Sequence, residues 1–105
     1  MTEKILSGRI AIITGANQGL GREISKSYVT AGANVMLCAR NYDLLEKVVL
    51  ELKPFLGENQ KIFIKKCDVT NENEVNALVH DTLDKLGGCQ ILVNNAGIYG
   101  PKGAI

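Results

Sequence analysis

The sequence contains no tryptophan, two prolines and a single histidine among its 105 residues, and its net charge at neutral pH is only +1. Because there is no excess of positive charge, nucleic acids and anionic membrane surfaces are not expected as partners. No apolar run approaches the ~18 residues that a membrane-spanning helix requires. The apolar run near the N-terminus lies inside a predicted strand and lacks the cleavage region of a signal peptide. These absences predict a cytoplasmic protein.

Cysteine is also scarce and its spacing is uninformative for metal binding. Cys38, Cys67 and Cys89 form no Cys-x-x-Cys motif, and the only histidine is His80. A metal site is therefore not expected. The cysteines are odd in number and lie in or beside predicted strands, which predicts reduced, buried thiols in place of disulfides.

What is present is enough for one domain with a real core, because 46% of the 105 residues are hydrophobic and 22% are charged. We expect a single domain over residues 1–105. Strands are predicted at 9–14, 34–39, 61–67 and 90–94. Helices are predicted at about 20–31, from about 41 to Pro54, and from Asn71 to Gly87. The face of the third helix that we expect to be buried consists of Val75, Leu78, Val79, Thr82 and Leu86.

This alternation predicts an α/β fold with a doubly wound parallel sheet. If the first three strands lie side by side, right-handed crossovers place the first two helices on one face of the sheet. A fourth strand beside the first then places the third helix on the opposite face. The predicted strand order is 3-2-1-4, and a ligand is expected between the first and fourth strands, where the order reverses.

Both strands at this reversal end in unusual loops. The first strand is followed by Gly15, Gly19 and Gly21 and then at once by a helix, which favours a pyrophosphate on the helix N-terminus. Gly15 and Gly19 permit tight turns and close approach of the backbone, and Gly21 permits close packing of the helix. The fourth strand runs into residues 94–97, Asn-Asn-Ala-Gly. Taken alone, the first loop could be a tight connection and the second an ordinary turn.

Together the two loops resemble the short-chain dehydrogenase/reductase family, whose motifs are TGxxxGxG and NNAG. Residues 14–21 and 94–97 match both motifs without a substitution. The G-x-G-x-x-G spacing of other dinucleotide folds is absent, since its third glycine would fall at Ile24. The resemblance covers essentially the whole chain and implies a Rossmann-type fold that corresponds to the N-terminal, cofactor-binding half of such enzymes.

The resemblance implies a set of residues that bind a nicotinamide dinucleotide. They are Gly15, Asn17, Gln18, Gly19, Leu20, Gly21, Arg40, Asn41, Asp68, Val69, Asn94, Ala96 and Gly97. By the same resemblance, Asp68 accepts a hydrogen bond from the adenine amino group, or it orders the turn before the third helix. Asn95 is expected to hold loop backbone across the sheet.

The end of the second strand favours NADP over NAD. An NAD-binding fold usually carries an acidic residue there for the ribose 2′-hydroxyl, but this chain has Ala39 followed by Arg40. A guanidinium suits a 2′-phosphate as a forked, permanently charged donor. The alternative is that Arg40 is a solvated charge near a helix start. Gln18 weakens the NADP interpretation, because NADP-preferring members of the family often carry a basic residue at that position.

The catalytic residues that the family uses are missing. No tyrosine is followed four residues later by lysine, because Gly32, Glu46 and Gly103 occupy those positions after Tyr28, Tyr42 and Tyr99. The resemblance implies hydride transfer between nicotinamide and a carbonyl or alcohol in a complete, homo-oligomeric enzyme. We expect this chain alone to bind cofactor weakly, to be inactive, and to self-associate through the apolar edge at its fourth strand. The alternative is a non-catalytic nucleotide-binding module.

Overall fold

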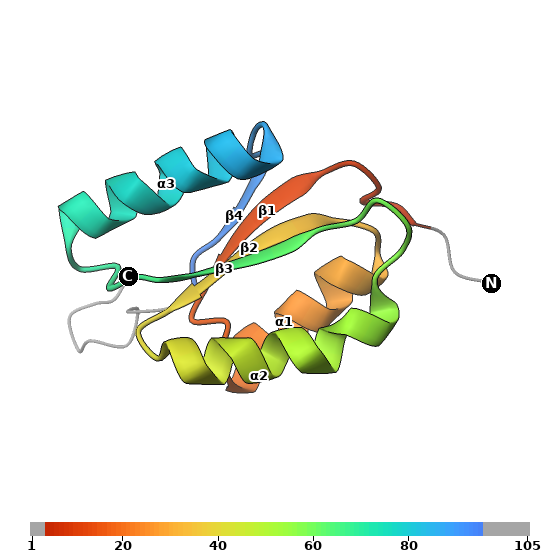
Figure 1. Ribbon diagram of the computed structural model, residues 1–105, viewed down its shortest axis with the longest axis horizontal. Coiled ribbons are helices and arrows are strands. Elements are labelled where there is room, and N and C mark those ends of the chain that lie inside the picture. Colours follow the sequence, from red (N-terminus) through yellow and green to blue (C-terminus); the bar gives the residue numbers. More distant parts are fainter. Residues whose placement is uncertain (1–3, 96–105) are drawn as a thin grey trace.

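The computed structural model describes residues 4–95, which form one parallel sheet covered by helices on both faces. In Figure 1 the helices over residues 19–30 and 42–52 cover one face of the sheet, and the helix over residues 72–86 covers the other. The elements in chain order are β1 (Ile10–Thr14), α1 (Gly19–Thr30), β2 (Asn34–Ala39), α2 (Tyr42–Leu52), the short 3-10 helix η1 (Lys53–Phe55), β3 (Ile62–Lys66), α3 (Glu72–Leu86) and β4 (Ile91–Val93). None of the helices in this part of the chain is both long and apolar enough to cross a membrane.

The strand order is β3-β2-β1-β4, which confirms the predicted 3-2-1-4 arrangement. All neighbouring strands are parallel, and Ile12 of β1 lies opposite Met36 of β2 on one side and Leu92 of β4 on the other. The first and fourth strands are therefore neighbours although about 80 residues separate them in the chain. This pairing brings the two unusual loops to the same edge of the sheet.

The sheet has two apolar faces because its central strands are buried on both sides. Every residue of β1 is buried, and so is every residue of β2 except Asn34, as expected of parallel strands covered by helices on both faces. Ile13 and Leu37 face α1 and α2 and belong to the larger core. Ile12 and Met36 face α3 and belong to the smaller one. The placement of α1 and α2 opposite α3 is the predicted one (Figure 1).

Two of the helices begin close to the predicted residues, Asn41 and Asn71, and each of these asparagines caps its helix. Asn41 Oδ1 accepts the N–H of Leu44 at 3.1 Å, and Asn71 Oδ1 accepts the N–H of Glu74 at the same distance. The helix α3 ends at Gly87, whose φ of 87° lies in the left-handed region that favours glycine. These caps hold the two loops that follow β2 and β3 in defined positions.

Three predictions need correction. The fourth strand is shorter than predicted, because only Ile91–Val93 pair with β1. Val79 is 41% exposed, since the buried stripe of α3 passes through Leu78 and Thr82 and Val79 lies to the side of it. Cys89 is exposed, because it falls in the loop between α3 and β4 and not within a strand. Cys38 and Cys67 are buried free thiols, as predicted.

Candidate functional site

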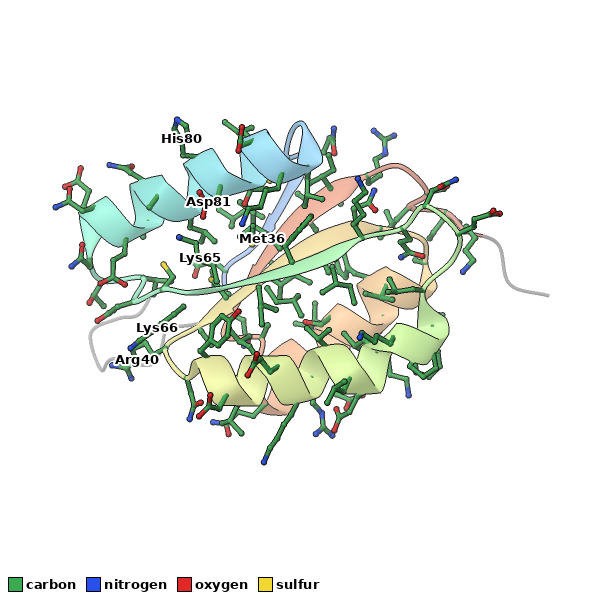
Figure 2. All side chains as sticks on the ribbon, in the orientation of Figure 1. Met36, Arg40, Lys65, Lys66, His80 and Asp81 are labelled. Carbon is green, nitrogen blue, oxygen red and sulfur yellow. The ribbon has the colours of Figure 1, made fainter. Side chains whose placement is uncertain are left out.

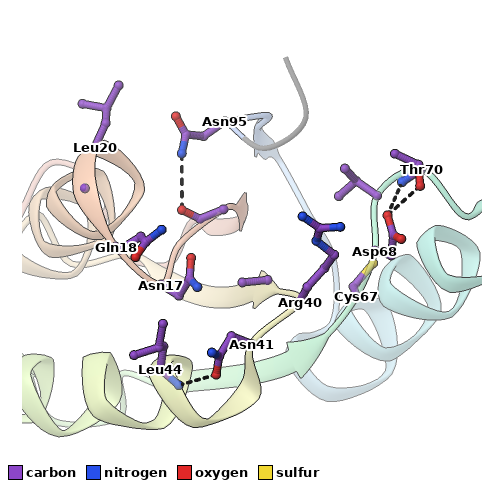
Figure 3. A pocket seen from close by; sticks show the side chains of 14 residues that line it. Asn17, Gln18, Leu20, Arg40, Asn41, Leu44, Cys67, Asp68, Thr70 and Asn95 are labelled. Carbon is purple, nitrogen blue, oxygen red and sulfur yellow. Dashed lines mark hydrogen bonds between the residues drawn. The ribbon is translucent and has the colours of Figure 1, made fainter. Parts of the chain in front are cut away.

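A cleft of about 660 Å³ opens at the carboxyl ends of the strands, between the glycine loop and the loops after β2 and β3. Nine of the predicted cofactor-binding residues line it: Gly15, Asn17, Gln18, Gly19, Leu20, Arg40, Asn41, Asp68 and Val69. Figure 3 shows these three loops around one cavity, with Asn95 at its upper edge. Gly21 and Asn94 lie next to the cleft and not along it, and Ala96 and Gly97 fall outside the described residues.

The glycine loop has a conformation that side chains rarely adopt. The φ angles of Gly15 and Gly19 are 63° and 57°, both in the left-handed region. A Cβ on Gly19 would meet nothing within 4 Å, so the loop presents open space on that side. A Cβ on Gly21 would lie 1.9 Å from the Gly15 carbonyl oxygen, which is sterically impossible without movement. Gly21 therefore shapes the site by letting α1 pack against the loop.

Hydrogen bonds between β1 and the end of β4 fix the glycine loop. The backbone N–H of Asn95 donates to Thr14 Oγ1 at 2.8 Å, and Asn95 Nδ2 donates to the Gly15 carbonyl at 3.3 Å. The Thr14 hydroxyl lies 3.3 Å from Asn94 Oδ1 and from the Val93 carbonyl oxygen, both of which are acceptors. Asn95 therefore holds loop backbone across the sheet, as predicted, while Asn94 faces Thr14.

The N-terminus of α1 differs from those of the other two long helices. Gln18 occupies its cap position but makes no side-chain hydrogen bond to the helix, and the first turn contains no acidic residue. In contrast, asparagine side chains cap α2 and α3, and both helices carry acidic residues in the first turn. The positive end of the α1 dipole is thus not neutralised by its own side chains, and it faces the cleft through Gly19 and Leu20.

Two charged side chains lie on the cleft opposite the glycine loop, Arg40 and Asp68. Asp68 Oδ1 accepts two hydrogen bonds, from Thr70 N at 2.9 Å and from Thr70 Oγ1 at 2.7 Å, as drawn in Figure 3. These bonds, with a smaller contribution from the positive charge of Arg40, hold the pKa of Asp68 below its ordinary value. Asp68 thus orders the turn before α3, which is one of its two predicted roles.

Buried sulfur atoms lie beneath this end of the cleft. Cys67 lines the cleft and is 1% exposed, and Cys38 belongs to the same apolar cluster on the α3 face. Burial raises the pKa of Cys38 to about 12. Burial and the nearby Glu74 carboxylate also raise the pKa of Cys67. Both thiols are therefore protonated at neutral pH. Within residues 4–95, no three His, Cys, Asp or Glu side chains are arranged to hold a metal ion.

Sequence reasoning missed several residues of the cleft. Those absent from the predicted set are Ala39, Leu44, Cys67, Thr70 and Asn95. Ala39, Cys67 and Thr70 adjoin predicted residues at the ends of β2 and β3, so their position next to the strand ends could have identified them. Leu44 lies within α2 and had no such signal. Thr70 carried a second signal, because Asp-x-Thr is a spacing at which the aspartate accepts hydrogen bonds from the threonine.

The family-level comparison agrees with this geometry. A family model described as short chain dehydrogenase matches residues 9–105. The chain belongs to the short-chain dehydrogenase family. This confirms the resemblance based on the glycine loop and on the loop after the fourth strand.

Similar proteins within the family include a 7alpha-hydroxysteroid dehydrogenase of Escherichia coli K12, which is 45% identical over 97 residues, or 92% of this chain. A crystal structure of hydroxysteroid dehydrogenase from Escherichia coli covers 94% of the chain with a TM-score of 0.83 and 44% identity. A 7 alpha-hydroxysteroid dehydrogenase complexed with NADH and 7-oxo glycochenodeoxycholic acid covers 88% of it, with a TM-score of 0.79 and 40% identity. The chain spans 37% of the length of the first of these relatives, 39% of the second and 35% of the third.

Proposed function

We propose that residues 1–105 are a single domain that binds a nicotinamide dinucleotide for an oxidoreductase, with NADP preferred over NAD. The observation that carries this proposal is the α1 N-terminus, which lacks a side-chain cap and an acidic first turn and faces the cleft through glycine. A pyrophosphate supplies the negative charge that this helix end lacks.

The residues of the cleft fit such a group. The open space beside Gly19 admits a phosphate close to backbone N–H groups. Asp68 and Val69 line the far side of the cleft, and we assign them to the adenine. Asn94 and the Ala96–Gly97 segment complete the proposed set along the adenosine ribose. The nicotinamide ring, when bound, supplies or accepts a hydride.

Arg40 supports the preference for NADP. It follows the last residue of β2, lines the cleft, and is exposed, whereas Ala39 stands where a carboxylate would receive a ribose 2′-hydroxyl. Figure 3 shows the guanidinium of Arg40 extending into the space between Asn95 and Asp68. The opposing observation is that a related structure contains NADH, which makes NAD the competing cofactor.

The substitution Arg40→Ala tests this preference. Binding of NADP and NAD to the chain should be measured by calorimetry, with Lys66→Ala as the matched control, because Lys66 pairs with Ala39 in the sheet but does not line the cleft. We expect Arg40→Ala to weaken NADP binding by roughly tenfold or more, as loss of a charged hydrogen bond does, and to leave NAD binding nearly unchanged. Equal affinity for the two cofactors in the native chain and in the variant would refute the preference.

We further propose that hydride transfer to a carbonyl, or from an alcohol, takes place in a homo-oligomer of a longer polypeptide. The described cleft provides groups for binding but no tyrosine or lysine side chain that could move the substrate proton. The chain alone is expected to bind the cofactor without turning it over. Consumption of reduced cofactor by the 105-residue chain with a 7-oxo steroid would contradict this and would place the catalytic groups within it. A non-catalytic nucleotide-binding module stays the alternative.

A further inference from the structure

The two carboxylate oxygens of Asp68 have different surroundings. Oδ1 accepts both hydrogen bonds from Thr70, at 2.7 and 2.9 Å, whereas no hydrogen bond or ion pair within residues 4–95 reaches Oδ2. Asp68 and Thr70 both line the cleft. Because Oδ1 is already engaged by two donors, Oδ2 is the oxygen that remains available to a ligand.

The backbone around Asp68 is held separately. Its N–H donates to Glu74 Oε1 at 2.8 Å, and the N–H of Glu74 is in turn bound by the Asn71 side chain at 3.1 Å. These bonds anchor the turn to the first turn of α3. They do not involve the Asp68 carboxylate, whose rotation is restrained by Thr70. The position of the turn and the orientation of the carboxylate therefore have distinct causes.

The proposed function already assigns Asp68 to the adenine, and we propose that Thr70 is the positioning residue that, by holding Oδ1, turns Oδ2 of Asp68 toward the 6-amino group of that base. This inference rests on the proposed binding of a dinucleotide with its adenine near Asp68. It goes further by assigning base selection to the side chain of Thr70.

The chemistry of the purine gives the proposal a specific readout. An ionised carboxylate only accepts hydrogen bonds, adenine presents an amino donor at position 6, and hypoxanthine presents a carbonyl oxygen there. NADP should therefore bind more tightly than its deamino analogue, nicotinamide hypoxanthine dinucleotide phosphate. We expect a ratio of at least about tenfold, which corresponds to one hydrogen bond to a charged group.

The substitution Asp68→Asn should reverse this selectivity. The two Thr70 donors require an acceptor, so the amide oxygen of the new side chain should take the place of Oδ1 and its NH₂ group should replace Oδ2. An amide donor at that position suits the hypoxanthine carbonyl. The deamino analogue should then bind more tightly than NADP.

The deciding experiment is calorimetric titration of the full chain with NADP and with the deamino analogue, for the native protein, Thr70→Val and Thr70→Ser. Thr70→Val removes the hydroxyl at similar volume and should lower the affinity ratio by about threefold or more, as loss of one hydrogen bond does. Thr70→Ser keeps the hydroxyl and should restore the ratio. Equal losses for both ligands in Thr70→Val, with the ratio unchanged, would show a purely structural role and overturn the inference while dinucleotide binding stands. Absence of binding of both ligands to the native chain would overturn the proposed function and this inference with it.

Discussion

Gly21 is a residue at which the fold leaves no room for a side chain. A Cβ there would lie 1.9 Å from the Gly15 carbonyl oxygen and 2.8 Å from Asn95 Nδ2. The oxygen belongs to backbone that is fixed between β1 and the glycine loop, so it cannot rotate away as a flexible side chain could. The close packing of α1 against this loop therefore depends on glycine at this position.

Gly21→Ala should destabilise the protein by about 1–3 kcal/mol, the usual cost of forcing extra volume into a well-packed position. It should also weaken dinucleotide binding, because the backbone that moves is the backbone of the cleft. Gly88→Ala is the matched control, since the nearest atoms to its added Cβ lie at 3.8 Å, an ordinary contact. Urea unfolding measures both variants. Equal stabilities for the two would contradict the steric argument.

At the scale of single residues, the sequence predicted conformational roles better than contacts. The glycines of the loop were identifiable because few residue types suit a backbone conformation with positive φ. The partners of Asp68 were harder to choose, because a carboxylate at a strand end can serve the turn, the ligand or both. The Asp-x-Thr spacing allows the bonds to Thr70, but the backbone of the turn shows that both of them go to the same carboxylate oxygen.

At the scale of elements, an ion pair links α3 to β3, one of the two edge strands of the sheet. Lys65 Nζ lies 2.9 Å from Asp81 Oδ2, with both side chains partly exposed (Figure 2). The hydrogen bond from Lys65 lowers the pKa of Asp81 below its ordinary value of 3.8. A charged side chain on an edge strand also discourages pairing with another chain. The pair therefore adds a charged contact between α3 and β3 to the apolar contacts that hold α3 on the sheet.

Lys65→Met should raise the pKa of Asp81 toward 3.8, which NMR titration of its carboxyl carbon measures directly. A carboxyl whose folded pKa is depressed contributes stability above its unfolded pKa and loses it as the pH falls through the folded pKa. The native chain should therefore exceed the variant in unfolding free energy by a constant amount down to about pH 5, and the difference should shrink below about pH 4. Lys66→Met is the control. An unchanged Asp81 titration in Lys65→Met would refute the pairing.

The helical and strand periodicities of the sequence predicted that each long helix and strand exists, but not the residues at which it begins and ends. Local signals supplied some of those residues. Asn41, Asn71 and Gly87 marked helix ends correctly because caps are local signals. Val79 was assigned to the buried face because its spacing fits a wide apolar stripe, but α3 crosses the sheet so that Leu78 and Thr82 face it and Val79 does not. The crossing angle of a helix depends on the whole packed layer, which periodicity does not contain.

At the scale of the whole molecule, apolar side chains remain exposed on β4 and on α3. Leu92 is 65% exposed, and it lies opposite Ile12, a residue of the α3-side core, so its side chain is on that face of the sheet. Val79 and Leu83 of α3 are 41% and 50% exposed. Within residues 4–95, β4 pairs with a strand on one side only. Such an edge, apolar and open to pairing, favours association with another polypeptide.

The 105-residue chain should therefore self-associate as its concentration rises, and Leu92→Lys should shift it toward monomer by placing a charge on the edge. Leu50→Lys is a closely matched control, because Leu50 of α2 is also 65% exposed but lies away from β4. Sedimentation velocity of the three proteins measures the effect. A native chain that stays monomeric and melts cooperatively would contradict the prediction, as would equal effects of the two substitutions.

The contact between β1 and β4 also has a consequence for synthesis on the ribosome. The backbone N–H of Ile10 donates to the side chain of Gln90, 80 positions later, whereas β2, the other strand neighbour of β1, is the next strand in the chain. At ~5–20 residues per second, β4 emerges only a few seconds after β3. During that interval the second edge of β1 is without its strand neighbour, and the carboxyl end that carries the glycine loop lacks the bonds from Asn95. The first strand to be made therefore stays open along one edge until the last of the four strands is available.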